Sequence, residues 1–220
     1  MTHTLHREGD RDSLEADFVV LAHTAAGYNV DGSATAVRAF LELAKKHGAD
    51  TNNIGIEAGS IYQMDYETME AEVSDEVSNP HAVFEDVDAL EAFLTDLCRL
   101  DLGISTVVSG LFDRTETVCE NVRERIDEGA EPRPHTARKW LGVYGNRKRL
   151  PEKPVRDVST MCGHAMVSFS LVREMRDAVA EGRLDARSAA ERLAEPCVCG
   201  VFNVERAQAL LEGMANERAD

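Results

Sequence analysis

The stretch Asp17–Ala58, DFVVLAHTAAGYNVDGSATAVRAFLELAKKHGADTNNIGIEA, decides the expected fold. Its first seven residues form an apolar, valine-rich run, which predicts a buried strand. After a glycine-containing loop, apolar residues at helical spacing predict a helix over residues 34–47, and Gly48 supplies its stop signal. A second short apolar run, over residues 53–58, predicts another strand.

The same alternation continues along the chain. Apolar patterns predict a helix over residues 87–100, a strand over 101–110, a helix over 114–126 and a fourth strand over 137–145. The acidic stretch 65–80 is typical of a helix with a surface loop. Strands that alternate with helices favour an α/β fold with a mostly parallel sheet and flanking helices. A helical, cysteine-rich C-terminal region follows it.

The expected domain organisation has four parts. Residues 1–16 are polar and charged, lack the apolar stretch of an export signal, and are expected to form a flexible tail. Residues 17–146 form the α/β domain. Two prolines mark residues 147–154 as a linker, and residues 155–220 form the helical region with the cysteines.

Composition excludes some classes of function. The chain has 220 residues, 40 acidic against 24 basic, and a formal net charge of −16, which argues against a nucleic-acid binder. Only five of the basic residues are lysines. An acid-rich, lysine-poor surface suits a salt-rich cytoplasm, so we expect a cytoplasmic, halophilic protein. No apolar run approaches the roughly 20 residues of a membrane span.

Soft metal ligands are concentrated near the C-terminus: Cys162 and His164 in one motif, Cys197 and Cys199 in another. Each motif precedes an expected helix, whose free amides and dipole favour thiolate over thiol. Clustered Cys and His in an intracellular protein are more often metal ligands or redox groups than disulfide partners. We therefore expect the two motifs to meet in one site.

Three chemistries fit that site. The four residues form a Cys3His zinc set, or the three late cysteines hold an iron-sulfur cluster, with Cys119 or His164 completing it. The cluster is the preferred interpretation, with an electron-transfer partner and a redox or cluster-dependent role. The third alternative is a metal-free thiol enzyme in which His164 or His135 activates Cys162. Cys98 continues an apolar helix face and is expected to be a core residue.

Two segments carry a resemblance: TMCGHAMVSFSLV (residues 160–172) and EPCVCGVFNVERAQALL (residues 195–211). They resemble the C-terminal pattern of an uncharacterised archaeal and bacterial protein family, over residues 102–214. The resemblance supports a site at the cysteines and implies no established activity.

A second candidate site lies in the expected sheet, because parallel sheets bind ligands beyond the carboxyl ends of their strands. The loops after the first and third strands supply His23, Asn29, Ser33 and Ser109 as candidate cofactor-binding residues. The first loop leads into a helix N-terminus, whose amides favour an anion. The alternative is that these loop residues simply form turns. A small anionic substrate is a candidate partner at the basic cluster beside His135, formed by Arg138, Lys139, Arg147, Lys148 and Arg149, where the alternative is a solvated face.

Overall fold

A computed structural model describes residues 7–77, 79–126, 132 and 144–219 of the chain. In this part of the chain the strands are β1 (Phe18–His23), β2 (Asn53–Ile56), β3 (Gly59–Ser60), β4 (His81–Phe84) and β5 (Ser105–Ser109). The α-helices are α1 (Arg11–Leu14), α2 (Ser33–Lys46), α3 (Tyr66–Glu72), α4 (Val87–Leu100), α5 (Phe112–Arg125), α6 (Lys153–Ser159), α7 (Phe169–Ala180), α8 (Ala186–Ala194) and α9 (Val204–Ala219). Two short 3-10 helices are η2 (Ala49–Thr51) and η3 (Arg147–Arg149).

The described strands form one sheet in the order β3-β2-β4-β1-β5, and every hydrogen-bonded pair in it is antiparallel. The prediction of a mostly parallel sheet is therefore wrong. The error arose because β4, a strand of four residues, was not recognised in the sequence. β4 lies between β1 and β2 and pairs with both of them.

The helical crossovers explain why the helices and strands predicted from sequence led to the wrong sheet topology. Helix α2 connects β1 to β2, and α4 connects β4 to β5; each crossover joins strands that point the same way, as expected. Each connection also skips one position, which a strand of the other unit fills in the opposite direction. This is a pair of interleaved split βαβ units. A crossover helix fixes the relative direction of two strands but not their adjacency.

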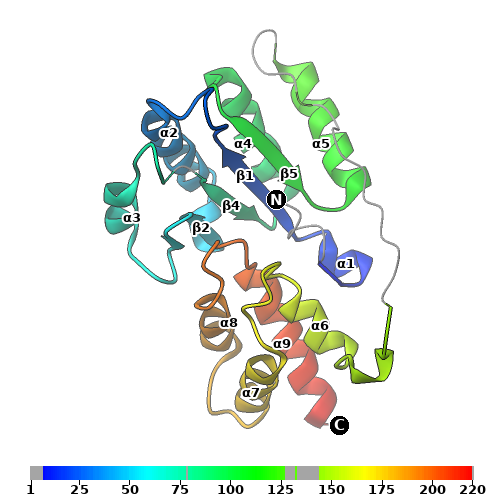
Figure 1. The fold of residues 1–220 in the computed structure, drawn as a ribbon. Coiled ribbons are helices and arrows are strands. Elements are labelled where there is room, and N and C mark those ends of the chain that lie inside the picture. Colours follow the sequence, from blue (N-terminus) through cyan, green and yellow to red (C-terminus); the bar gives the residue numbers. More distant parts are fainter. Residues whose placement is uncertain (1–6, 78, 127–131, 133–143, 220) are drawn as a thin grey trace.

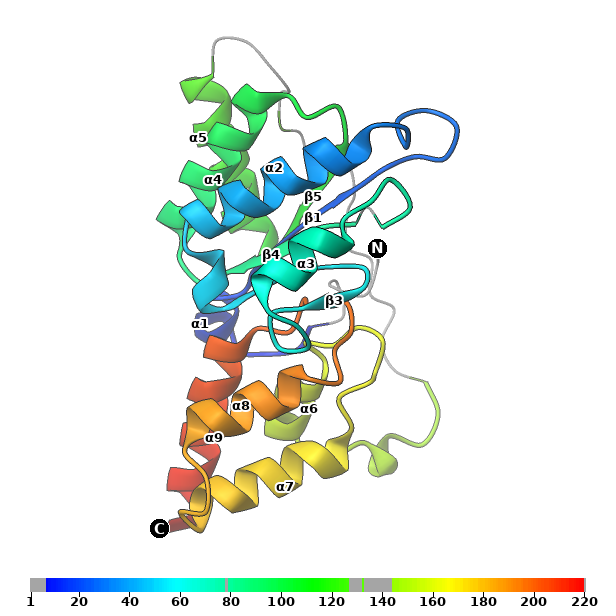
Figure 2. The ribbon, with the colours of Figure 1, turned by 90° about the vertical axis from the view of Figure 1, so that its left-hand side faces the viewer.

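Both faces of β1 are buried, because alternate side chains of a strand point to opposite faces. Phe18 and Val20 pack in a cluster with α2 and α4, which we call the α2/α4 core. Val19 and Leu21 pack with the helices α6 to α9, and we call this cluster the C-terminal core. Figures 1 and 2 show the four C-terminal helices gathered on one side of the sheet and α2 and α4 on the other.

Several helix boundaries follow directly from local sequence. Asp185 caps α8 by accepting a hydrogen bond from the Ser188 amide, as predicted, and Gly182 ends α7 with a φ of 68°. Helix α7, however, begins at Phe169 behind the cap Ser168. It therefore starts further along the chain than the Ala165 expected from the sequence.

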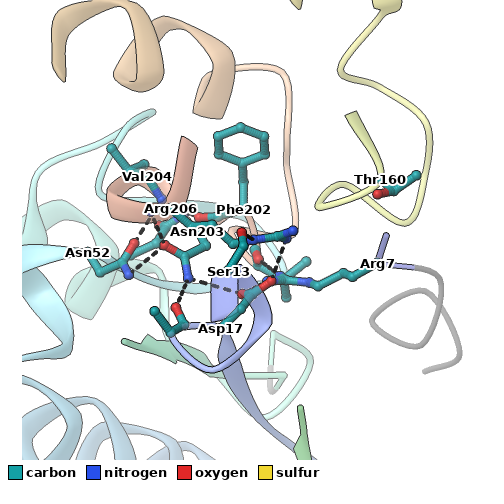
Figure 3. Close-up of polar contacts among 12 residues, drawn as sticks. Arg7, Ser13, Asp17, Asn52, Thr160, Phe202, Asn203, Val204 and Arg206 are labelled. Carbon is teal, nitrogen blue, oxygen red and sulfur yellow. Dashed lines mark hydrogen bonds and ion pairs between the residues drawn. The ribbon is translucent and has the colours of Figure 1, made fainter. Parts of the chain in front are cut away.

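The N-terminal segment before β1 contributes to a buried polar network (Figure 3). Residues 7–16, assigned to the tail from sequence, contain α1 and place the buried Arg7 against Asp17. Asp17 also accepts from Arg206 at 2.8 Å and from the Asn203 side chain at 3.0 Å. Burial lowers the pKa of Arg206, while the Asp17 carboxylate stabilises its charge. The network ties the start of β1 to the start of α9.

Some sequence predictions lie outside the described residues. They include most of the fourth predicted strand, together with His135. The predicted linker contains η3, which is exposed, and the first residues of α6. Within the described ranges, every helix is too short or too polar to cross a membrane.

Candidate functional site

Three of the five cysteines meet between two loops of the C-terminal region. Cys162 lies in the loop from α6 to α7, and Cys197 and Cys199 lie in the loop from α8 to α9. Cys162 and Cys197 are buried at 2 % and 0 % exposure, whereas Cys199 is partly exposed. All of the chain's cysteines are free thiols. The expected meeting of the two motifs therefore takes place.

The packing of the last helices brings these loops together. Helices α7 and α8 both pack on α9, and α6 packs on α7 and α9. The second loop is a tight turn in which the Cys197 amide donates to Ala194 O at 2.9 Å and the Gly200 amide donates to Cys197 O at 2.8 Å. This turn places the sulfurs of Cys197 and Cys199 3.7 Å apart.

The sulfur of Cys162 lies in a cradle of hydrogen-bond donors. Its largest stabilising partner is the Cys197 thiol, and the backbone amides of His164, Met166 and Val167 also donate to it. These donors outweigh the desolvation of the sulfur and lower the pKa of Cys162 to about 6. The cradle therefore favours the thiolate form of Cys162.

The backbone that forms the cradle is unusual at one position. Ala165 has a φ of 55°, in the left-handed region that residues with a Cβ rarely adopt. Its amide donates to Cys162 O at 3.0 Å, and Ser159 Oγ holds the end of the loop by donating to Val167 O at 2.6 Å. Successive amides that turn toward one point form an anion-binding nest. Loop amides thus stabilise the Cys162 thiolate, in place of the dipole of the helix that was predicted to start at Ala165.

Cys197 is the central thiol of the cluster. It is hydrogen-bonded to both Cys162 and Cys199, and these bonds, with its burial, raise its pKa far above the ordinary value. Cys197 is therefore the protonated donor beside the Cys162 thiolate. Among the described residues, no group of three or more Cys, His, Asp or Glu side chains is arranged to hold a metal ion.

Exposed apolar side chains border the thiol loops. Met166 is 52 % exposed and Phe169 42 %, and both follow Cys162 closely in the chain. Val198, between the two cysteines of the second motif, is 51 % exposed. Large apolar side chains are thus exposed close in sequence to both sets of thiols.

Sequence reasoning missed His81, a buried histidine on β4. Its ring packs against Gly200, the residue after Cys199; a Cβ at Gly200 would overlap the ring and lie 2.7 Å from the Ser60 Cβ. Gly200 also has a φ of 61°. The four residues of β4 are too few for a periodic signal, so nothing in the sequence pattern indicated His81. In the structure it lies on the same face of β4 as Val83, which belongs to the C-terminal core.

Two predicted metal ligands lie elsewhere. His164 is exposed on the Cys162 loop, and its backbone amide donates to the Cys162 sulfur. Cys119 is on α5, whose buried residues belong to the α2/α4 core. Cys119 interacts there with Cys98, which packs against that core as expected, and burial raises the pKa of both thiols.

The second candidate site does not assemble as expected, because the antiparallel sheet separates its parts. His23 pairs with Ser105 at one end of β5, and Ser109 pairs with Val19 at the other. The four residue-to-residue steps from Ser105 to Ser109 along an extended strand span about 14 Å. Asn29 braces its own loop: its side chain accepts from the Ala25 amide and donates to Gly103 O, both at 2.7 Å.

The helix N-terminus at Ser33 already holds an anion from the protein itself. The Asp75 carboxylate accepts from the Ala34 amide at 2.9 Å and from the Gly32 amide at 2.8 Å. These bonds lower the pKa of Asp75. The position in which an anionic cofactor was expected is thus filled by a carboxylate side chain.

Comparison with known proteins adds no further information about this site: no protein-family model, no curated protein and no solved structure matches the chain. The chemistry of the thiol cluster is therefore the feature that indicates a function.

Proposed function

We propose that this chain carries out reversible thiol–disulfide chemistry, with Cys162 and Cys197 as the redox pair. The observation that carries the proposal is the hydrogen bond from the Cys197 thiol to the Cys162 sulfur, in a cradle of backbone amides. A stabilised thiolate in contact with a protonated thiol is the arrangement that dithiol oxidoreductases need. It corresponds to the metal-free alternative, with loop amides and Cys197 activating Cys162 in place of a histidine.

Oxidation of the pair balances with a disulfide as the oxidant. Formation of the Cys162–Cys197 bond removes two electrons from the two sulfurs and releases the proton of Cys197. An external disulfide R–S–S–R accepts both electrons, and its sulfur–sulfur bond breaks to give one thiolate and one thiol. The electron-transfer partner expected from the sequence is therefore a molecule that carries a disulfide.

The cradle also favours one redox state. Donors that stabilise the Cys162 thiolate stabilise the reduced pair relative to the disulfide, which makes the disulfide easier to reduce. A cytoplasmic location fits this preference, because that compartment keeps thiols reduced. We accordingly propose that the protein works in the cytoplasm and returns to the dithiol state after each oxidation.

A single soft metal ion is the second candidate, favoured by one distance. Tetrahedral zinc with Zn–S bonds of about 2.3 Å places its sulfurs about 3.8 Å apart. The Cys197 and Cys199 sulfurs are 3.7 Å apart. An iron-sulfur cluster of the cubane type suits this pair less well, because each cysteine binds a different iron. Any metal would also require Cys162 to move, since no three-ligand group is preformed among the described residues.

Anaerobic purification without added metal separates the candidates. The proposal expects colourless, metal-free protein that forms a Cys162–Cys197 disulfide in a glutathione redox buffer, detected by mass spectrometry after alkylation. Cys98→Ser is the matched control, because Cys98 is a partly buried thiol in the other core. One zinc per chain that is lost in Cys197→Ser would favour the second candidate. Iron with acid-labile sulfide would establish the cluster.

A further inference from the structure

The thiol cluster is exposed to solution at only one end. Cys162 and Cys197 are 2 % and 0 % exposed, so a disulfide in solution has no line of attack on either sulfur. Cys199 is partly exposed and follows the exposed Val198. Thiol–disulfide exchange requires the attacking sulfur to reach the disulfide directly. A disulfide in solution therefore reaches the Cys199 sulfur more easily than either sulfur of the proposed redox pair.

The contacts among the sulfurs give a path inward from Cys199. Its sulfur is 3.7 Å from that of Cys197, and Cys197 is also hydrogen-bonded to Cys162. A disulfide bond is about 2.05 Å long, so Cys197 and Cys199 need to close a gap of about 1.6 Å, within reach of side-chain rotation in a turn. Cys197 can thus bond to either neighbour without a rearrangement of the helices.

We propose that Cys199 is the outermost thiol of a three-cysteine relay, which exchanges with disulfides in solution and passes the oxidation through Cys197 to Cys162. This inference rests on the proposed function. It assigns to the third cysteine a role that a simple two-thiol site leaves unused. The chemical class of the partner is a disulfide small or flexible enough to reach a partly exposed sulfur.

The relay consists of three balanced exchanges. Deprotonated Cys199 attacks R–S–S–R, forms a mixed disulfide and releases one RS⁻. The Cys197 sulfur then attacks the Cys199 sulfur and forms the Cys197–Cys199 bond, while its proton passes to the departing sulfur, which leaves as RSH. Finally the Cys162 thiolate attacks Cys197, forms the buried Cys162–Cys197 bond and regenerates the Cys199 thiolate. In total, R–S–S–R gains two electrons and the buried pair loses two.

The test compares rate with equilibrium. Wild-type protein, Cys199→Ser and the control Cys98→Ser are mixed with oxidised glutathione, quenched with acid, alkylated and analysed by mass spectrometry. We expect Cys199→Ser to form the Cys162–Cys197 disulfide at least about tenfold more slowly, with a nearly unchanged oxidised fraction at equilibrium. Cys98→Ser is expected to match the wild type. Cys199→Ala is the second variant, should the serine disturb the turn.

A trapping experiment identifies the thiol that reacts first. In Cys197→Ser the relay is interrupted, so we expect glutathione to accumulate on Cys199. Glutathione on Cys162 instead, or a wild-type rate in both Cys199 variants, would overturn the relay while leaving the redox pair intact. Failure of wild-type protein to form the Cys162–Cys197 bond even at equilibrium would overturn the proposed function itself.

Discussion

Removal of the Cys197 thiol should raise the pKa of Cys162, because this thiol is its largest stabilising partner. A hydrogen bond to a charged group contributes about 1.5–3 kcal/mol, and a thiol is a weak donor, so the low end applies. Since one pKa unit corresponds to about 1.36 kcal/mol, the pKa of Cys162 in Cys197→Ala should rise by about one unit. It should stay below the ordinary value, because the amides of the loop remain.

The assay is the ultraviolet absorbance of the thiolate, titrated in protein whose Cys98 and Cys119 are replaced by serine. Cys199→Ala is the matched control: it removes a neighbouring thiol that is not among the donors to Cys162, and its titration should keep a midpoint of about 6. An unchanged midpoint in Cys197→Ala would refute the reasoning, since the cradle amides alone would then account for the acidity of Cys162.

Other predictions concern stability. The pKa of Cys162 is lowered on folding, so its thiolate stabilises the protein most above pH 9.0, the unperturbed value, and this contribution is lost as the pH falls through about 6. The difference in unfolding free energy between wild type and Cys162→Ser should therefore shrink toward low pH. Urea denaturation at several pH values across this range measures it. Gly200→Ala should destabilise the protein by clearly more than the roughly 1–2 kcal/mol cost of a left-handed backbone, because the new Cβ would overlap neighbouring side chains. Gly182→Ala is the control: Gly182 has a φ of 68° and open space around it, so this variant should lose only the backbone cost. Similar losses in chemical denaturation would contradict the packing argument. Asp17→Asn should lower the unfolding free energy by about 3–5 kcal/mol, because the buried guanidinium groups lose their carboxylate. Glu152→Gln, at an exposed ion pair, should lower it by at most about 1 kcal/mol. Equal shifts in melting temperature for the two variants would show that the buried network is energetically unimportant.

Local sequence determined the elements whose signals are short-range. The valine-rich run of β1, the apolar stripe of α4 and the cap Asp185 each depend on neighbours within a few residues, and all three lie where the sequence placed them. The two cysteine motifs were also visible, because close spacing of thiols can be seen directly in the sequence. That the motifs meet followed from the helices between them.

Only the tertiary structure decided which strands are neighbours and which side chains share a site. Strand β4 is four residues long, too short for a periodic signal, yet its insertion makes the sheet antiparallel and places His23 and Ser109 at opposite ends of a strand pair. The same holds for Cys119, whose helix packs in the other core. Periodicity reports which face of an element is apolar, but adjacency is a long-range property that depends on how all elements bury their faces together.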